Sequence, residues 1–151
     1  MGLSLARILK SHKESKRKRQ AELFSNVTNI TKILEDEKFV QSRRALRKNK
    51  LLTDLRDETN NDALISEIDI ATEDAARYVA TTYDRLGFIL KHDKELEDEF
   101  INWQSYNIAD MWQLTKALVT KKWRTKNKIY LTEFERLVSR ALDNENIGET
   151  E

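Results

Sequence analysis

The chain has 151 residues, 39% of them hydrophobic, which is enough to bury the core of one ordinary domain. Charged residues make up 35% of the chain, and there are only three glycines, no proline and no cysteine. These absences exclude disulfides, thiolate zinc sites, cysteine nucleophiles and glycine-rich phosphate-binding loops. Because turns between strands depend on glycine and proline, the composition predicts an all-α fold, a compact bundle of five or six helices in a single domain.

The sequence carries no signal for secretion or membrane insertion. Its longest apolar run, residues 86 to 90, is far shorter than the roughly 20 residues that a spanning helix needs. The N-terminus lacks the long apolar stretch of a secretory signal peptide. We therefore expect no transmembrane segment and a cytoplasmic location.

Charge is distributed unevenly along the chain. Residues 1 to 20 hold seven bases and one acid, a net charge of +6, whereas the remaining 20 bases and 25 acids give −5. Acids gather at residues 93–99 and again after Asp143. This pattern predicts a mobile basic N-terminal segment (1–20), a helical domain (21–143) and a disordered acidic tail (144–151).

Apolar residues at helical spacing predict the first elements of the domain. A helix over about residues 20 to 35 is predicted by an apolar row formed by Leu23, Val27, Ile30 and Leu34. A second helical segment begins near Phe39 and ends at Asn49 or at Leu55. It carries a basic cluster of Arg43, Arg44, Arg47, Lys48 and Lys50. The polar run at residues 57–62 predicts a loop.

Thr72 marks the predicted start of the next helix, because its hydroxyl can cap free backbone amides and two acids follow it. A stripe of small and apolar residues then extends from Ala75 to Leu86. The stripe can either close the core or pair with a second copy of the chain, so the sequence leaves a homo-oligomer open. Gly87 follows the stripe, where a left-handed helix cap would favour glycine.

Three tryptophans lie in the second half of the chain. Trp112 and Trp123 are three helical turns apart and share a face, but Trp103 would point the opposite way on one continuous helix. We therefore expect a short acidic helix over residues 93–103, a bend near residues 105–107 and a longer helix, which together bring all three rings to the core.

The last helix is expected to begin near Leu131, where residues 132–135 match a capping box. Its apolar residues continue to Leu142. The acidic residues that follow are expected to fray.

Few residues are placed for catalysis. His12 lies in the basic segment and His92 in an expected loop, and neither has a partner at a recognisable spacing. Glu95, Asp98 and Glu99 share a helix face, but a divalent cation usually needs oxygens from more than one element, so a solvated acidic face is favoured. We predict no catalytic residue, no metal ligand and no cofactor, and hence a protein that is not an enzyme.

Basic residues are the clearest candidates for binding. Four consecutive bases follow Lys10 and Lys13, a density that attracts a phosphate backbone or another anionic surface. Trp123 is flanked by bases and could stack a nucleobase, although aromatic residues at helical spacing more often belong to the core. The candidate residues for nucleic-acid or anionic-surface binding are Lys10, Lys13, Lys16, Arg17, Lys18, Arg19, Lys121, Lys122 and Arg124.

The start of the chain also suits a membrane surface. A short apolar face lies beside the bases and consists of Leu3, Leu5, Ile8 and Leu9. It then meets His12, Ser15 and Arg19, so only two apolar turns are available and the anchoring would be weak.

The middle and C-terminal part of the chain carries an ordered set of features that is found in a known family. The features are Glu37-Lys38-Phe39-Val40-Gln41-Ser42-Arg43-Arg44, then Ala75-Ala76-Arg77-Tyr78-Val79 leading to Tyr83-Asp84-Arg85-Leu86-Gly87, then Met111-Trp112-Gln113-Leu114 with a basic stretch, and a closing Phe134-Glu135-Arg136-Leu137. Over residues 20–142 the chain resembles the bacterial and archaeal family called domain of unknown function 4760. The resemblance implies a compact helical domain with no established activity. Many members carry an N-terminal membrane-spanning segment, where this chain has a short basic segment instead.

The leading hypothesis for function is a non-catalytic binding or scaffolding module that acts through protein partners. It follows from well-formed amphipathic helices without a catalytic constellation. One alternative is nucleic-acid binding through residues 10–19 with help from residues 121–128. Another is peripheral membrane association through residues 3–9 and the basic run.

Overall fold

The computed structural model describes the backbone of residues 2–150 and the side chains of residues 4–145. Within that range the chain forms seven α-helices and one short 3₁₀ helix, without strands. The elements are α1 (Gly2–Leu34), α2 (Glu37–Lys48), α3 (Lys50–Asp57), α4 (Asp62–Glu67), α5 (Ile70–Leu90), α6 (Lys94–Lys121), η1 (Trp123–Thr125) and α7 (Thr132–Thr150). The predicted all-α single domain is confirmed, with seven helices rather than five or six.

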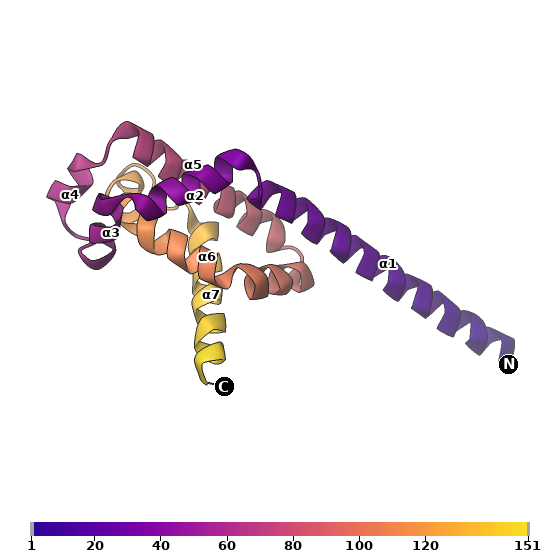
Figure 1. The fold of residues 1–151 in the computed structure, drawn as a ribbon. Helices are drawn as coiled ribbons and strands as arrows, with labels where there is room; N and C mark the ends of the chain where they lie inside the picture. The colour runs from indigo at the N-terminus through magenta and orange to yellow at the C-terminus, as the bar shows by residue number, and fades with distance from the viewer. Residues whose placement is uncertain (1, 151) are drawn as a thin grey trace.

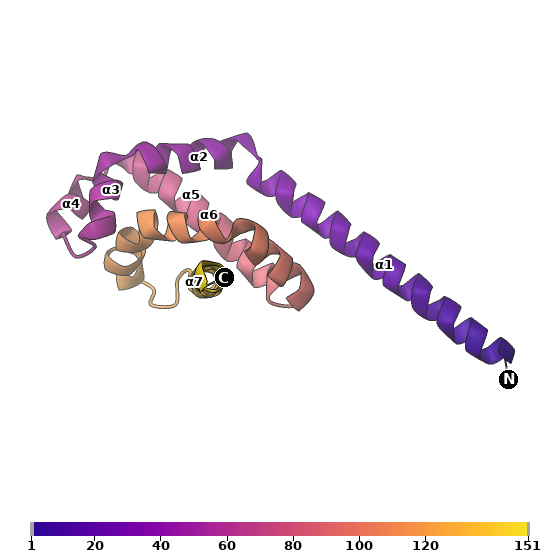
Figure 2. The ribbon, with the colours of Figure 1, turned by 60° about the horizontal axis from the view of Figure 1, so that its bottom comes forward.

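Two parts of the molecule are packed differently. Residues 35–150 form a compact body, whereas α1 leaves the body and projects into solvent (Figure 1, Figure 2). With 33 residues, α1 is about 50 Å long. Its last turns pack on the body, where Ile30 and Leu34 are buried, and its residues 4–22 are all exposed. Residues 4–20 are called the arm from here on.

Four aromatic rings from four helices meet at the centre of the body. Phe39 of α2 meets Tyr83 of α5 edge-on at 5.5 Å between ring centroids, and Phe134 of α7 stacks on Tyr83 at 5.4 Å. Trp112 of α6 meets Phe134 edge-on at 5.5 Å. Such pairs contribute about 0.5–1.5 kcal/mol each beyond the area they bury. The cluster therefore ties α2, α5, α6 and α7 into one core, and burial raises the pKa of Tyr83 to about 12.

Asparagine and aspartate side chains begin four of the helices, because each accepts a hydrogen bond from a free backbone amide of the first turn. The caps are Asn49 for α3, Asn61 for α4, Asp69 for α5 and Asp93 for α6. Asn49 also ends α2, and it separates two helices where the sequence left one segment with two possible ends. The break between α3 and α4 falls at residues 58–61, inside the expected loop.

The expected start of α5 at Thr72 is wrong. The helix begins at Ile70, and the amide of Thr72 donates to Asp69 Oδ1 at 2.7 Å. The cap is therefore Asp69, three residues before Thr72, and the Thr72 hydroxyl instead accepts a hydrogen bond from Asn49 Nδ2 at 3.2 Å.

The expected left-handed cap at Gly87 is also wrong. Gly87 lies inside α5, which continues to Leu90, and its φ is not positive. A Cβ placed on Gly87 would lie 3.0 Å from the carbonyl oxygen of Glu133 and 3.1 Å from Leu137 Cδ1. The glycine is therefore needed because α7 approaches the backbone of α5 closely, and the stripe from Ala75 to Leu86 is used to close the core.

The division into two helices expected near residues 105–107 is wrong, because α6 is one continuous helix from Lys94 to Lys121. Neither glycine nor proline interrupts the segment, and Ser105 is buried against α7, where its hydroxyl donates to Glu145 Oε1 at 2.5 Å. On a continuous helix Trp103 takes the face opposite to Trp112. Trp123 is buried and Trp112 is half-buried against the core, but Trp103 is 47% exposed.

The capping box expected at the start of α7 is wrong as well. The helix begins at Thr132, one residue after the predicted start, and the buried Leu131 before it takes the left-handed conformation with φ 64°. The free amide of Phe134 donates to Asp84 Oδ1 of α5 at 2.9 Å, so the cap comes from another helix.

Both chain ends extend the terminal helices. The basic segment expected to be mobile is the first part of α1, since it consists of good helix formers without proline. The acidic tail expected to be disordered continues α7 to Thr150, and Glu145 at its start contacts Ser105. The side chains of Leu3 and of the tail residues 146–151 lie outside the described residues.

Candidate binding surfaces

The arm presents the predicted basic residues of the N-terminal segment to solvent. All six of them are exposed: Lys10, Lys13, Lys16, Arg17, Lys18 and Arg19. Among the described residues, only Arg19 of this set has an ion-pair partner, with Nη2 lying 3.1 Å from Glu95 Oε2 of α6. Both side chains are more than half exposed, and such pairs contribute about 0–1 kcal/mol. The arm is thus a cationic helix with little attachment to the body.

One face of α1 changes its chemistry along the helix. The residues that face the body are spaced at i, i+4, i+7 and i+11: Leu23, Val27, Ile30 and Leu34. At the same helical spacing this face continues toward the N-terminus through Arg19, Lys16 and His12 to Leu9 and Leu5. The face is therefore apolar at the body, basic in the middle and apolar again near the tip.

The predicted binding residues Lys121, Lys122 and Arg124 lie far from the arm, and two of them are already in ion pairs. In both views the tip of α1 and the segment 121–130 lie at opposite ends of the molecule (Figure 1, Figure 2). Lys122 Nζ lies 2.7 Å from Glu73 Oε2, and Arg124 pairs with Glu135 at 2.6 Å. Lys121 is exposed. The structure therefore does not bring the two groups of predicted binding residues together.

Trp123 is held by groups that prevent it from stacking a nucleobase. Its Nε1 donates to Glu73 Oε1 at 2.9 Å, and the Arg77 guanidinium covers the ring at 4.6 Å from the centroid. Burial raises the pKa of Glu73, but hydrogen bonds from Lys122 and Trp123 outweigh burial and leave that pKa lowered. The ring is 6% exposed, so the core interpretation of Trp123 is confirmed.

Some arginines of the basic cluster of α2 make contacts within the fold. Arg47 Nε donates to Asp110 Oδ2 of α6 at 2.9 Å, and Arg56 of α3 donates to the other oxygen of the same carboxylate at 3.2 Å. Arg43 lies over the ring of Phe39 at 5.1 Å. Arg47 and Arg56 therefore fasten α2 and α3 to α6, whereas the contact of Arg43 with Phe39 lies within α2.

A buried carboxylate joins α6 to α7. The side chain of Glu97 is 5% exposed and accepts from Arg136 at 2.5 Å and from Arg140 at 2.6 Å. Arg136 also donates to the Gly87 carbonyl of α5 at 2.9 Å. Burial raises the pKa of Glu97, but the hydrogen bonds from the two arginines outweigh it, so the pKa is lowered. Each carboxylate oxygen of Glu97 accepts from a guanidinium, so the cluster fastens three helices. Neither oxygen is left free to act as a general base.

The acids and histidines considered for chemistry are dispersed. Glu95 pairs with Arg19, Asp98 pairs with Arg140, and His92 lies edge-on to Phe88 at 6.0 Å between ring centroids. His12 lies on the exposed arm. In the part of the chain that the structure describes, no three such side chains gather where they could hold a metal ion.

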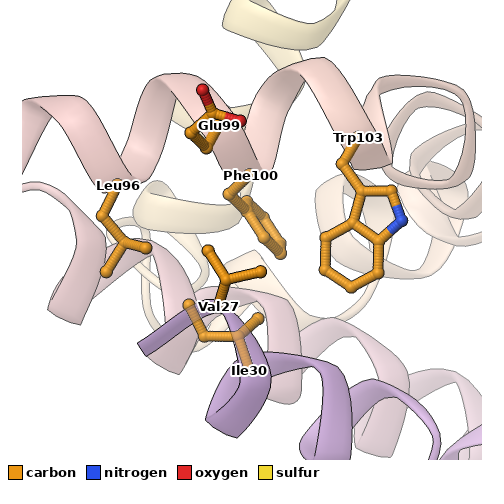
Figure 3. A pocket seen from close by; sticks show the side chains of 6 residues that line it. All are labelled: Val27, Ile30, Leu96, Glu99, Phe100 and Trp103. Carbon is orange, nitrogen blue, oxygen red and sulfur yellow. The ribbon is translucent and has the colours of Figure 1, made fainter. Parts of the chain in front are cut away.

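An apolar groove opens between α1 and α6 (Figure 3). It has a volume of about 290 Å³ and is lined by Val27, Ile30, Leu96, Glu99, Phe100 and Trp103. In the close-up the rings of Phe100 and Trp103 hang from α6 toward Val27 and Ile30 of α1 (Figure 3). We call this feature the Trp103 groove. The sequence analysis did not predict this groove. The signal was the spacing of Trp103 and Trp112, which puts the two rings on opposite faces of a continuous helix and so leaves Trp103 away from the core.

No family model, curated protein or solved structure matches the chain significantly. The resemblance to the family called domain of unknown function 4760 therefore stays a prediction. Within residues 2–150, none of the helices combines the length and apolar character required for a membrane span.

Proposed function

We propose that the chain is a non-catalytic scaffolding module that acts through a protein partner, and that the Trp103 groove receives an amphipathic helix of that partner. The observation that carries the proposal is the groove itself. Trp103 is 47% exposed beside the buried Phe100, so a large apolar ring borders an open apolar floor. Exposed aromatic residues next to a desolvated pocket are typical anchors of protein interfaces.

The shape and charge of the groove favour a helix over a small molecule. At about 290 Å³ it lies at the lower limit of small-molecule pockets, and apart from one carboxylate its lining side chains are apolar. Exposed apolar side chains continue one turn further on both of its walls, at Ile33 of α1 and Tyr106 of α6. The exposed Glu99 lies among the lining residues. A helix with an apolar row and a basic flank would match this arrangement.

Carboxylates inside the fold are bound by other side chains, which supports a non-catalytic role. The carboxylates of Glu73, Glu97 and Asp110 each accept from two basic groups or from a base and an indole. A general base needs a free lone pair directed at a substrate, and these carboxylates are committed to holding helices together.

Selection of helical peptides tests the proposal without a known partner. A display library of random amphipathic peptides would be panned against the full chain, and retained peptides would be tested for loss of binding to Trp103→Ala. We expect peptides with apolar residues at i, i+3 or i+4 and i+7 and with Lys or Arg beside them, binding at least about tenfold more weakly to the variant.

A matched control is Ile129→Ala, which removes an apolar side chain that is 74% exposed and does not line the groove. Selected peptides that bind Trp103→Ala as tightly as they bind the unchanged chain would overturn the proposal, and so would peptides without basic residues. Glu99→Lys should weaken binding of the basic peptides, because it reverses the charge at the groove.

A further inference from the structure

We propose that the arm docks on an anionic lipid bilayer, with Leu5, Ile8 and Leu9 inserted at the headgroup boundary and with Lys13, Lys16 and Arg19 against the anionic headgroups. This use of the arm is separate from the Trp103 groove and holds whether or not the groove binds a partner.

The arm combines the two features that an interfacial helix needs. Leu5, Ile8 and Leu9 follow the spacing i, i+3, i+4, so they share one face, and they are 60%, 64% and 56% exposed. One turn and more beyond them on that face come His12, Lys16 and Arg19, and Lys13 lies at its edge. A single face is thus apolar near the tip and cationic along its length, which suits a surface with an apolar interior and an anionic rim.

Charge on the arm selects an anionic surface. Between residues 4 and 20 there are seven bases and one acid, Glu14. These bases repel one another at i, i+3 and i+4, and no acid in the first turn of α1 compensates the helix dipole. An anionic surface removes that repulsion, so it strengthens the helix that it binds. Each base close to such a surface adds to the affinity, whereas a neutral bilayer gives no such gain.

Nucleic acid or a second copy of the chain would satisfy fewer of the arm's side chains than a bilayer would. Nucleic acid would engage the bases but would leave Leu5, Ile8 and Leu9 in water. A second copy of the chain, paired antiparallel over the whole length of α1, would bring the four bases at 16–19 of one molecule against those of the other. The bilayer is the occupant that buries the apolar residues and neutralises the bases together.

Vesicle binding of the full chain tests the proposal with two triple variants. One is Leu5→Ser, Ile8→Ser and Leu9→Ser, which keeps every charge, and the other is Lys13→Gln, Lys16→Gln and Arg19→Gln, which keeps the apolar face. The matched controls are Lys121→Gln, Lys126→Gln and Lys128→Gln, and Trp103→Ala. Since arm residues do not contact the core, both arm variants should unfold with nearly the same midpoint as the unchanged chain.

The readouts are flotation and helix content by circular dichroism at about 0.15 M salt. The vesicles are phosphatidylcholine alone or phosphatidylcholine with about 30% phosphatidylserine. We expect binding to the anionic vesicles with a gain of helix signal, and binding about tenfold or more weaker to neutral vesicles and for each arm variant. The controls should change binding less than about twofold, because their residues lie away from the arm.

Several results would overturn the proposal. They are equal binding to neutral and anionic vesicles, full binding by the serine variant, or no binding of the unchanged chain to anionic vesicles. A parallel titration with a fluorescent DNA duplex separates the nucleic-acid alternative. Duplex binding that is unaffected by the serine variant, together with vesicle binding that is absent, would assign the arm to nucleic acid instead.

Discussion

The arm and the body are both helical, but different forces hold the two regions. In the body, apolar faces are buried between helices and the interior charges are paired, as with Glu97 between Arg136 and Arg140. In the arm, Leu5, Ile8 and Leu9 are exposed and the helix is held by its own backbone hydrogen bonds. Most helix stability in proteins comes from packing of an apolar face, and the arm has no such packing. The comparison indicates that the body carries the fold and that the arm is free to change its contacts.

The largest effect is expected at the buried carboxylate of the body. Glu97→Gln leaves two guanidiniums without their shared anion, and we expect the free energy of unfolding to fall by about 3 kcal/mol. Urea denaturation measures the change. Glu99→Gln is the control, since Glu99 is exposed on the same helix, and its effect should stay within about 0.5 kcal/mol. A loss below about 1 kcal/mol for Glu97→Gln would mean that the cluster does not fasten α6 to α7.

Acid should weaken the body through the same group. The folded-state pKa of Glu97 lies below the ordinary value of 4.5, despite burial, because Arg136 and Arg140 hold the charged form. A carboxyl with a lowered folded pKa contributes its full stability above the unfolded pKa and loses it as the pH falls through the folded pKa. The urea midpoint should therefore drop as the pH falls below about 4.5, with a shallower drop for Glu97→Gln. An identical pH profile for the two proteins would exclude Glu97 as a source of the acid sensitivity.

A smaller loss is expected where α5 and α7 touch. Gly87→Ala places a methyl group 3.0 Å from the Glu133 carbonyl, and the resulting overpacking outweighs the gain of about 1 kcal/mol in helix propensity. We expect a net loss of about 1–2 kcal/mol by urea denaturation, with a larger loss for Gly87→Val. An increase in stability for Gly87→Ala would show that α7 can move away from α5 without penalty.

The sequence predicted the parts of the fold that depend on local pattern. The apolar row from Leu23 to Leu34 and the break after Asp57 need only the helical period and a run of polar residues, and both occur. Gly87 could not be predicted in the same way, because its role depends on Glu133, which is distant in sequence and close in space. A glycine near a helix end has the same local appearance in either role.

The candidate surfaces also differ in how far the local sequence could predict them. The exposure of the basic arm residues follows from their composition, and the structure has them exposed. The Trp103 groove depends on whether residues 94–121 form one continuous helix, and the sequence of residues 105–107 contains no feature that decides this. Trp123 was ambiguous because the bases on either side of it are neighbours in sequence, whereas Glu73 and Arg77, which hold the ring, come from another helix.

Asp84 should have a moderate effect through the start of α7. Asp84→Ala leaves the amide of Phe134 without its acceptor, and we expect a loss of about 1 kcal/mol in the free energy of unfolding. Asp84→Asn keeps an acceptor oxygen at the same place and should recover more than half of that loss. Thermal and urea unfolding of both variants measure the difference. If Asn and Ala lose equally, the charge of Asp84 matters rather than its hydrogen bond.

The smallest effect is expected at the only ion pair that joins the arm to the body among the described residues. Arg19→Ala removes an exposed pair with Glu95 and should change the free energy of unfolding by less than about 0.5 kcal/mol. Arg47→Ala is the contrast within the body, because Asp110 is 12% exposed and Arg47 also bonds Asn107, so its loss should be larger. Hydrogen exchange should show the same order, with amides of residues 4–18 exchanging fast and those of α5 slowly. Equal losses for Arg19→Ala and Arg47→Ala, with protected arm amides, would place the arm within the folded unit and remove the distinction between the two regions.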